Sequence, residues 1–511
     1  MDTKALRQKI LDLAIRGKLV PQDPNDEPAG VLLERIREQK QQMLKEGKLK
    51  KKDIKNDTII FKGEDNLHYE KLQDGTVKCI EDEIPFEVPE GWAWTRLCNL
   101  SSLIQYGLSN SAEAQGTHRL LRITDIQDGK VNWKAVPFTT VENAENYLLR
   151  KDDIVFARTG ATVGKSFLVT ELPFESVYAS YLIRIRLFDC ISPSYLYQFF
   201  NSYCYWEQIT DKSVGVGQPN CNGTSLKELF IPLPPLHEQK KIVPAANALL
   251  KYASVIESER ASLQEIIDLT KSKILDLAIR GKLVPQDPND EPASVILERI
   301  RTEKEELIKQ GKIKRDKKES VIFKGDDNSY YGIHLPDSWN WASLREIALS
   351  ISDGSHNPPP NNGSGIPLLS AANINDNSIL MNEISRWITN EEWKIENQRT
   401  NIEVGDVLLT IVGSIGRSAV VQNNNHFALQ RSVAVIKPCI INPLYLMHIV
   451  QSPQIQKWLT DNSKGTAQKG IYLNALSLML IPIPPLAEQA RIVERIHIAY
   501  KQLDLISNAL L

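Results

Sequence analysis

The sequence KILDLAIRGKLVPQDPNDEPA spans residues 9–29 and recurs letter for letter at residues 273–293, 264 positions later. The similarity continues beyond it, because VLLERIREQKQQMLKEGKLKKK (31–52) matches VILERIRTEKEELIKQGKIKRD (295–316) at the same displacement. Internal repetition of this length determines the architecture before any secondary structure is considered. We therefore predict that the chain consists of two copies of one structural unit.

A second repeated block lies at a different displacement. IPLPPLHEQKKIV (231–243) matches IPIPPLAEQARIV (481–493), 250 positions later. The repeated blocks enclose two segments that have diverged much further, 84–235 and 334–485. Duplication explains the repetition, but it does not explain why the flanks stayed nearly identical while these segments changed. The unevenness predicts a common framework that carries two different binding domains.

A long helix is predicted from Leu236 to Gly281, where apolar residues recur at a heptad-like spacing. The two rows of the stripe are Ile242, Leu249, Ile256, Leu263, Thr270 and Leu277, and Ala246, Ala253, Ile267 and Ile274. Such a stripe favours packing against a partner helix. At about 1.5 Å per residue the helix could reach roughly 69 Å and hold two domains apart. Pro244 is tolerable in an opening turn or produces a kink.

The two ends of the chain each carry part of the same stripe. The C-terminal segment 486–511 repeats its first half, and residues 1–16 repeat its second half. The corresponding residues in the second half are Leu6, Ile10 and Leu13 for Thr270, Ile274 and Leu277. Placed end to end, the two terminal helices would nearly rebuild the central one. The sequence therefore predicts a pseudo-twofold circular arrangement with two long antiparallel, coiled-coil-like helices and adjacent termini.

The composition of the chain excludes several classes of protein. Its 511 residues are enough for roughly two to four domains, and 42% hydrophobic with 24% charged residues is typical of globular proteins. Neither a membrane-spanning apolar run nor a signal-peptide core is visible, so we expect a cytoplasmic location and no membrane partner. The six cysteines form no C-x-x-C pair and are interpreted as reduced thiols. A formal charge of −2 excludes a generally basic nucleic-acid binder but permits local basic faces.

The order of these blocks resembles the DNA-specificity subunit of Type I restriction-modification systems. The matching motifs are I-P-[IL]-P-P-L-x-E-Q at Ile231–Gln239 and Ile481–Gln489, and A-I-x-G-K-L-V-P-Q at Ala14–Gln22 and Ala278–Gln286. The resemblance covers essentially the whole chain. It implies two mixed α/β target recognition domains, built mostly from strands, that each read half of a bipartite DNA site. It also implies that the long helices set the gap between the half-sites.

The repeats and the resemblance together give the predicted domain boundaries. They are 1–16 for a helix that completes the C-terminal framework helix, 17–83 for a connector with a charged helical insertion, 84–235 for the first target recognition domain, 236–281 for the central framework helix, 282–333 for a second connector with the same insertion, 334–485 for the second target recognition domain, and 486–511 for the C-terminal framework helix. The long insertions depart from many members of the family, and their role is open.

The resemblance further implies that this chain is not itself an enzyme. It would bind double-stranded DNA and dock modification (methyltransferase) subunits, two in number, together with restriction subunits that act as ATP-dependent translocase and nuclease. S-adenosylmethionine, ATP and Mg²⁺ would then belong to those partners, and no cofactor or metal to this chain.

Polar, glycine-rich stretches supply the candidate DNA contacts, because phosphates need basic or amide donors and base edges need paired hydrogen-bonding groups. In the first variable domain the predicted contacts are Gln105, Tyr106, Ser109, Asn110, His118, Arg158, Thr159, Lys165, Lys212 and Gln218. In the second they are Ser355, His356, Asn357, Ser414, Arg417, Gln430, Arg431, Lys464, Gln468 and Lys469. Ordinary solvated turns have the same composition and stay an alternative. The basic runs at 45–52 and 309–318 favour solvated, partly helical hairpins, with phosphate or partner contact left open.

Two short strings imitate catalytic motifs. Asn357–Pro360 resembles the N-P-P-[FY] motif of adenine methyltransferases but lacks the aromatic residue that stacks on the flipped base. Gly160–Ser166 resembles a phosphate-binding loop but has three residues between its glycines instead of four, so a turn between two strands is predicted.

Two other functions compete with a non-catalytic DNA-binding subunit. A self-sufficient DNA methyltransferase or nuclease would need a cofactor-binding fingerprint or a metal-ligating acidic cluster, and the sequence offers neither. A protein–protein scaffold that never binds DNA is the third possibility.

Overall fold

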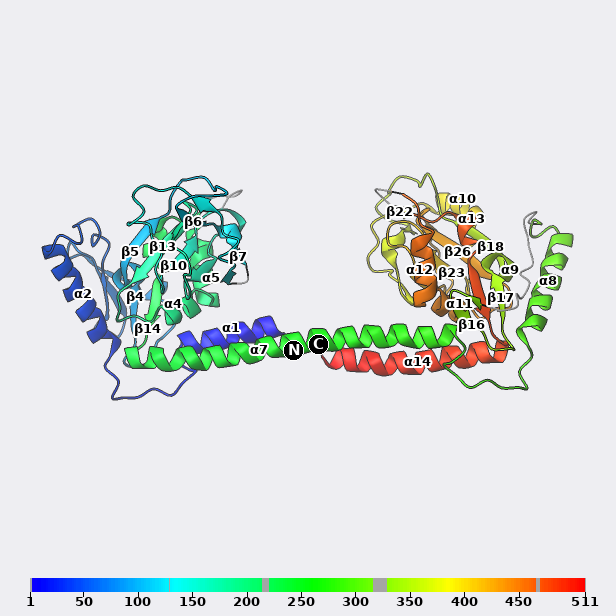
Figure 1. Cartoon of the computed structure of the whole chain (residues 1–511), viewed down its shortest axis with the longest axis horizontal. Coiled ribbons are helices and arrows are strands. Elements are labelled where there is room, and N and C mark those ends of the chain that lie inside the picture. The colour runs from blue at the N-terminus through cyan, green and yellow to red at the C-terminus, as the bar shows by residue number, and fades with distance from the viewer. Residues whose placement is uncertain (1, 128, 214–219, 316–328, 466–468, 511) are drawn as a thin grey trace. The chain divides into compact units, whose positions relative to one another are not determined.

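The computed structural model describes residues 2–510 except 128, 214–219, 316–328 and 466–468. It divides into two compact units, Met1–Glu259 (unit 1) and Arg260–Leu511 (unit 2). The same series of elements occurs in both units, which fits the duplication predicted from the repeats (Figure 1). Within the described residues, no helix has both the length and the apolar character needed to cross a bilayer.

The variable part of unit 1 is built on a four-stranded antiparallel sheet with the order β11-β10-β13-β5. Its strands are β5 (Ser101–Tyr106), β10 (Ile154–Ala157), β11 (Ser166–Leu168) and β13 (Leu182–Leu187). Successive residues of β10 enter two different cores, because side chains alternate across a strand. Ile154 and Phe156 pack with α4 (Pro193–Phe199) and α5 (Tyr203–Lys212), whereas Val155 and Ala157 pack on the opposite face.

A second sheet and a strand pair complete this part of unit 1. The sheet has the order β12-β6-β9 and consists of β12 (Ser176–Tyr178), β6 (His118–Leu121) and β9 (Phe138–Thr139). The pair joins β4 (Ala93–Arg96) to β14 (Phe230–Leu233). Because β4 opens the variable segment and β14 closes it, this pair brings both ends of the segment to the start of the framework helix.

Unit 2 repeats this plan. Its four-stranded sheet has the order β18-β26-β23-β24, and its smaller sheet and strand pair are β22-β19-β25 and β17-β27. The bounds are β17 (Asn340–Ser343), β18 (Ala348–Asp353), β19 (Ile366–Leu369), β22 (Trp387–Ile388), β23 (Val407–Thr410), β24 (Ser418–Val420), β25 (Ala428–Leu429), β26 (Val433–Pro438) and β27 (Leu480–Ile483). Its helices are α8 (Ala293–Lys309), α9 (Leu344–Ile347), α10 (Asn390–Thr400), α11 (Pro443–Val450), α12 (Pro453–Asp461) and α13 (Leu473–Leu476).

The framework helices form close to where the stripe places them. The central helix α7 is continuous over Leu236–Ile279, with Pro244 inside it. In unit 1, α1 (Thr3–Ile15) lies alongside α7 (Figure 1). In unit 2, α14 (Leu486–Ala509) runs antiparallel to α7, because Lys271 pairs with Asp504 at 2.6 Å while Gln264 accepts from Ser507 at 2.8 Å.

The predicted stripe is only partly buried. Ala246 and Ala253 are fully buried, whereas Leu249 and Ile256 are 41% and 36% exposed. One row therefore packs within the structure and the other is left partly open to solvent. Met1 and Leu511 lie outside the described residues, and the meeting of the termini stays a prediction.

The insertion in the first connector contains a sheet that the sequence analysis did not predict. The helix α2 (Ala29–Lys45) is followed by three antiparallel strands, β1 (Ile59–Lys62), β2 (His68–Lys71) and β3 (Val77–Cys79). Arg96 at the end of β4 holds this sheet by pairing with Glu70 of β2 at 2.9 and 2.8 Å. The strands have few buried side chains, so they lack the apolar alternation that identifies a strand from sequence.

The two units differ where α4 in unit 1 and α11 in unit 2 meet the framework helices. In unit 1, Gln198 of α4 donates to the carbonyl of Val243 and to Asn247 Oδ1, at 3.2 and 3.0 Å. In unit 2 the corresponding residue is His448, whose ring centroid lies 6.1 Å from that of Tyr500. Burial, aided by repulsion from His497 and opposed by a hydrogen bond with Gln451, lowers the pKa of His448 from 6.5 to about 4.

This lowered pKa makes unit 2 sensitive to mild acid. Between pH 6.5 and 4 the unfolded chain binds a proton at this position and the folded unit does not, so stability falls as the pH drops. Between pH 7.5 and pH 5, His448 is expected to cost unit 2 about 2 kcal/mol of unfolding free energy. Urea unfolding of the wild type and of His448→Gln, which installs the residue of unit 1, measures the difference. An equal loss in both proteins would contradict the assignment.

Candidate nucleic-acid interface

Four loops of unit 2 meet at one end of its main sheet, where β18 and β23 end and β24 and β26 begin. Backbone hydrogen bonds of 2.9–3.1 Å join them. In each of them the amide of the first residue donates to the carbonyl of the second. The pairs are Gly354 and Val433, Ile411 and Ser432, Ile471 and Ile411, Gly413 and Lys469, and Arg431 and Ser355. Loops that are up to 117 residues apart in the sequence, such as those of Gly354 and Ile471, thus form one surface.

Most of the predicted contact residues of unit 2 are presented on this surface. The exposed ones are His356, Asn357, Ser414, Arg417, Arg431, Lys464 and Lys469. Gln430 is half-buried, Ser355 is buried, and Gln468 lies outside the described residues. No described carboxylate lies within ion-pair distance of Arg417, Lys464 or Lys469, so their charges remain available to an anionic ligand.

Arg399, which the sequence analysis missed, fixes one of these loops. Its guanidinium hydrogen-bonds the Asp353 carboxylate and, through Nε, the Asp353 carbonyl at 2.9 Å. His356 Nε2 lies 2.8 Å from the same carboxylate. Arg399 comes from α10, which begins at the capping box of Thr389 and Glu392. The helix thereby holds His356 at the rim of the loop surface.

Unit 1 has a corresponding surface at the same end of its sheet. Its loops are joined by amide-to-carbonyl bonds from Gly107 to Leu182 (3.1 Å), Arg158 to Tyr181 (3.1 Å), Ser180 to Leu108 (2.7 Å) and Cys221 to Arg158 (3.0 Å). The Arg158 guanidinium lies 4.9 Å from the ring centroid of Tyr106 and donates to the carbonyl of Ser180 at 3.0 Å. Tyr106, Ser109, Asn110 and Lys165 are exposed, and Arg158 and Thr159 are half-buried.

Three further predicted residues of unit 1 are half-buried and contact other parts of the protein. Gln105 accepts from the buried guanidinium of Arg184 at 2.5 Å. His118 begins β6 in the second sheet, where its Nδ1 lies 2.8 Å from Thr117 Oγ1. Lys212 ends α5 and pairs with Glu228 at 3.5 Å. Gln218 lies outside the described residues.

Tyr181 belongs to the unit 1 surface and was not predicted. Its side chain is 59% exposed, and its carbonyl accepts from the Arg158 amide. An alignment of the two copies could have identified Tyr181 as a candidate. The stretch ALQRS (428–432) was a candidate in the second copy, and its structural counterpart in the first copy is VYASY (177–181).

The glycine-rich string at 160–166 is a turn between strands, as predicted. It connects β10 to β11, which pair antiparallel, so no helix N-terminus is available to hold a phosphate in the manner of a nucleotide-binding loop. Gly164 has φ +89, and a Cβ there would lie 2.5 Å from the Trp206 ring. Gly416 has φ +101 at the corresponding turn. These glycines position Lys165 and Arg417 at equivalent places on the two surfaces.

The P-P-L-x-E-Q motif fastens each variable domain to its framework helix. Trp92 donates its ring N–H to Glu238 at 2.8 Å, and Trp339 donates to Glu488 at 3.0 Å. Burial raises the pKa of both carboxyls, although the tryptophans favour the ionised form. The adjacent Gln239 accepts from the Ser192 amide that begins α4 and donates to the carbonyl of Pro234. The identical motif therefore makes the same connection in both units.

One group among the described residues has the side chains of a metal site, namely His68, Glu81 and Glu87, whose donor atoms lie within 4.8 Å of one another. Glu81 lies 2.7 Å from His68 Nδ1, and Glu87 pairs with Lys62 at 2.8 Å. These contacts already engage the carboxylates, and we derive no metal chemistry from the group.

Comparison with known proteins identifies relatives along most of the chain. The family model for the Type I restriction modification DNA specificity domain matches residues 112–266 and 336–510. The EcoEI specificity subunit of Escherichia coli, a Type I restriction enzyme subunit, is 27% identical over 99% of this chain and 90% of its own length. The EcoAI specificity subunit of Escherichia coli is 28% identical over 73% of this chain and 67% of its own length.

A solved structure has a similar fold. It is described as showing complex assembly and conformational transition of the type I R-M system, and one of its chains superposes with a TM-score of 0.58. The sequences are 20% identical, and the match covers 83% of this chain and 94% of that one.

Proposed function

The chain belongs to the Type I restriction-modification DNA specificity family, and from this premise we propose that its two loop surfaces each read one half of a bipartite DNA target. As a specificity subunit it recognises DNA sequence for a Type I restriction-modification system. The observation that carries the proposal is the position of the loop surfaces. The family match at 112–266 contains loops of the unit 1 surface, and the match at 336–510 contains loops of the unit 2 surface. The two surfaces present different side chains at equivalent positions.

The side chains of the surfaces fall into two groups, one suited to phosphate contacts and the other to base contacts. Lys165, Arg417 and the lysines of the 464–469 loop supply charge for phosphates, which carry no sequence information. The exposed Tyr106 and the half-buried Arg158 of unit 1 correspond to Asp353 and Ile411 in unit 2, which are buried, so only unit 1 offers a side chain to the bases at these two positions. This difference supports two half-sites of unlike sequence.

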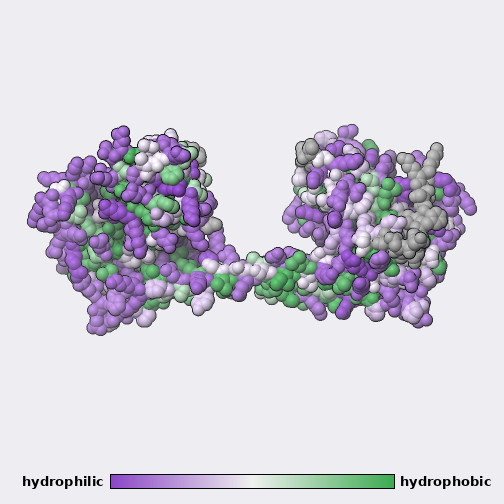
Figure 2. Space-filling model, viewed as in Figure 1, coloured by the Kyte–Doolittle hydropathy of each residue, from purple (hydrophilic) through white to green (hydrophobic). Residues whose placement is uncertain are grey.

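Partner subunits would dock on the framework helices. Tyr252, Leu269 and Leu505 are 67%, 62% and 63% exposed on α7 and α14, and Figure 2 shows hydrophobic residues gathered on the helices. Apolar side chains that gather on an exposed surface are typical of protein interfaces. We propose one modification subunit for each unit, with S-adenosylmethionine, ATP and Mg²⁺ bound by the partners.

The spacer role proposed for α7 has support from a repeated contact. In unit 1, Arg7 of α1 contacts Ser254 and Glu257 of α7. In unit 2, Lys271 is the repeat counterpart of Arg7 and Asp504 is the counterpart of Ser254, and these two residues also form an ion pair. The same helix contact in both units favours pseudo-twofold symmetry, with α7 setting the gap between half-sites.

Replacing the loop lysines of unit 2 is expected to weaken DNA binding without changing its sequence preference. Loss of both charges in Lys464→Ala/Lys469→Ala should lower affinity for target and non-target duplex by the same factor. The slope of log affinity against log salt should fall by about two, because each lysine releases roughly one counterion. Titration by fluorescence anisotropy measures both quantities. Lys282→Ala, which removes an exposed charge outside the surface, serves as control. A change confined to the target duplex would assign these lysines to base recognition.

Exchange of a variable segment tests the function itself. The chain would be expressed with its modification subunits, and methylated adenines would be mapped across the genome. Replacing residues 84–235 by the corresponding segment of a relative should change one half of the methylated motif and leave the other half unchanged. Methylation of DNA by the purified chain alone, supplied with radiolabelled S-adenosylmethionine, would instead support a self-sufficient methyltransferase.

A further inference from the structure

The turn that follows α2 concentrates positive charge in a chain whose formal charge is −2. We call residues 45–55 the basic turn. Its lysines are Lys45, Lys48, Lys50, Lys51, Lys52 and Lys55, and all of them are exposed. Glu46 and Asp53 are the only acidic residues of the segment. Among the described residues, Glu46 pairs with Lys48 at 2.7 Å, and no carboxylate lies within ion-pair distance of the other five lysines.

The basic turn is an ordered structure. The amides of Lys48 and Leu49 donate to the carbonyl of Met43 at 2.9 and 3.2 Å and close the end of α2. The Lys50 amide donates to Asp53 Oδ2 at 2.8 Å, so Asp53 organises the turn. Ile54 and Leu49 are half-buried and hold it against the rest of the insertion. The lysines therefore project from a fixed backbone.

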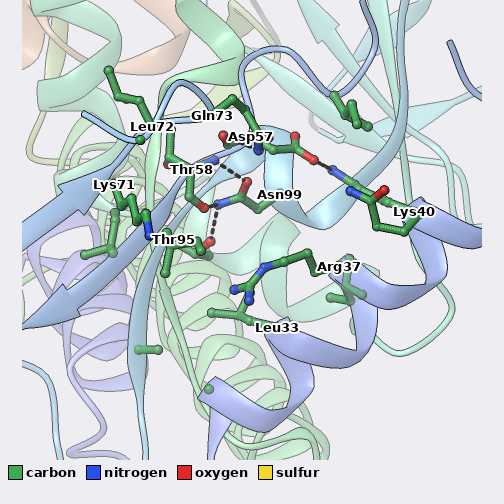
Figure 3. A pocket seen from close by; sticks show the side chains of 18 residues that line it. Leu33, Arg37, Lys40, Asp57, Thr58, Lys71, Leu72, Gln73, Thr95 and Asn99 are labelled. Atoms are coloured by element: carbon green, nitrogen blue, oxygen red, sulfur yellow. Dashed lines mark hydrogen bonds and ion pairs between the residues drawn. The ribbon is translucent and has the colours of Figure 1, made fainter. Parts of the chain in front are cut away.

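A buried lysine that precedes the basic turn in the chain joins the insertion to the variable domain. Lys40 of α2 donates to Asp57 Oδ2 and to the carbonyl of Cys98, both at 2.8 Å. Figure 3 shows this pair at the rim of a cavity, with Asn99 bonded to the neighbouring Thr58 and Thr95. The position of the basic turn relative to the recognition sheet is thus set by direct contacts.

The lysines of the basic turn face a hollow of suitable chemistry. A shallow cavity of about 410 Å³ is lined by Leu44, Lys51, Lys52, Ile54, Lys55 and Gln73. Three of its six lining side chains are cations and one is an amide donor. Such a surface favours an anion with several oxygens, which can accept from ammonium and amide groups together.

Unit 2 repeats the feature. After α8, the exposed residues Lys309, Lys312, Lys314 and Arg315 occupy the same place in the repeat. Arg315 pairs with Glu305 at 2.6 Å, so the three lysines carry the charge that corresponds to the unit 1 feature. Lys304, the counterpart of Lys40, donates to the carbonyl of Arg345, the counterpart of Cys98, at 2.9 Å. The insertion belongs to the framework that is nearly identical in both copies, whereas the recognition surfaces differ. A contact that is the same beside two unlike half-sites cannot depend on base sequence.

We propose that the basic turns bind the sugar-phosphate backbone of the duplex beyond the bases that the loop surfaces read. This inference rests on the proposed function. Flexible lysines act as point charges without the paired geometry that discriminates bases, so they strengthen binding to any flanking sequence. The footprint of the chain then extends past each half-site, and a protein of nearly neutral charge gains affinity from its insertions.

The test compares two duplexes on the complex assembled with its modification subunits. One duplex ends at the edges of the methylated motif, and the other extends it by about ten base pairs on each side, one helical turn of duplex. Wild type is expected to bind the extended duplex more tightly. In Lys51→Ala/Lys52→Ala/Lys55→Ala this advantage should fall about tenfold, and the salt slope for the extended duplex should drop by about three. Lys51→Arg/Lys52→Arg/Lys55→Arg should retain both.

The control variant is Lys18→Ala/Lys134→Ala/Lys151→Ala, which removes three exposed charges from unit 1 outside the basic turn, the loop surface and the framework helices. It should leave the advantage of the extended duplex unchanged. Equal binding of the two duplexes by wild type would overturn the inference. So would a basic-turn variant that keeps its DNA affinity but no longer assembles with the modification subunits, since the turn would then contact protein. Failure of the proposed function gives a different result, namely no preference for the target over an unrelated duplex.

Discussion

Replacing Trp339 by alanine is expected to lower the unfolding free energy of unit 2 by about 3–5 kcal/mol, because it removes a large side chain that is fully buried in the main core. The substitution also removes one hydrogen-bond donor from Glu488, which is 1% exposed and keeps Gln286 as its partner at 2.5 Å. Hydrogen–deuterium exchange should show lost protection in β17 and β27, which flank the cavity. Peptides from residues 84–235 of unit 1 should keep their protection.

Two further substitutions separate packing from hydrogen bonding at this position. Trp339→Phe keeps most of the ring but cannot donate to Glu488, so the pKa of that carboxyl should rise further and the loss of stability should be smaller. Glu488→Gln removes the cost of burying a charge but leaves one oxygen to accept from two N–H donors, so it should cost about 1 kcal/mol at pH 7, well below the loss in Trp339→Ala. A loss in Glu488→Gln as large as that in Trp339→Ala would show that the carboxylate charge is needed, contrary to this account.

Arg96→Ala is expected to be comparably damaging in unit 1, at about 3–5 kcal/mol, because it leaves the buried Glu70 carboxylate with the half-exposed Lys78 in place of a buried guanidinium. Glu70 is 2% exposed and accepts two hydrogen bonds from Arg96. Burial alone would raise its pKa, but the hydrogen bonds and charge of Arg96 lower the pKa of Glu70 to about 2. The pair therefore stabilises the folded unit above about pH 4.5, and this contribution is lost as the pH falls towards 2.

The expected readout is release of the insertion sheet, measured as faster hydrogen exchange in β1–β3, together with a lower unfolding midpoint. Lys78→Ala is the matched control, since Lys78 lies 3.5 Å from Glu70 but is 45% exposed and should contribute little. The double variant Arg96→Met/Glu70→Met removes both charges and should recover much of the loss. If Arg96→Ala were tolerated as well as Lys78→Ala, the buried pair could not be what holds the insertion.

The repeat carried most of the information about architecture. The boundaries of α7 follow from an uninterrupted apolar stripe, and the observed helix ends two residues before the predicted Gly281. By contrast, the small sheet of the insertion was missed because its strands bury few side chains, and those that β2 buries, His68 and Glu70, are polar, so no apolar alternation is visible. Periodicity identifies an element only where one of its faces is buried.

The site was predicted less completely than the fold. Charged and glycine-rich residues such as Arg417 and Lys469 stand out in the sequence, and both lie on the unit 2 surface. Arg399 did not, because its role depends on Asp353, 46 residues away. Gln105 has the composition of a DNA contact, yet in the structure its amide serves the buried Arg184.

The sequence by itself determined that there are two copies, which segments vary, and where the framework helices run, because these properties are recorded in local repetition and periodicity. Only the tertiary structure decided which side chains share a surface. That choice is made by hydrogen bonds such as Gly413 to Lys469 and Arg158 to Tyr181, between strands and loops far apart in the chain. Such contacts form only once the sheet has closed and its core is buried, so no local pattern of residues specifies them.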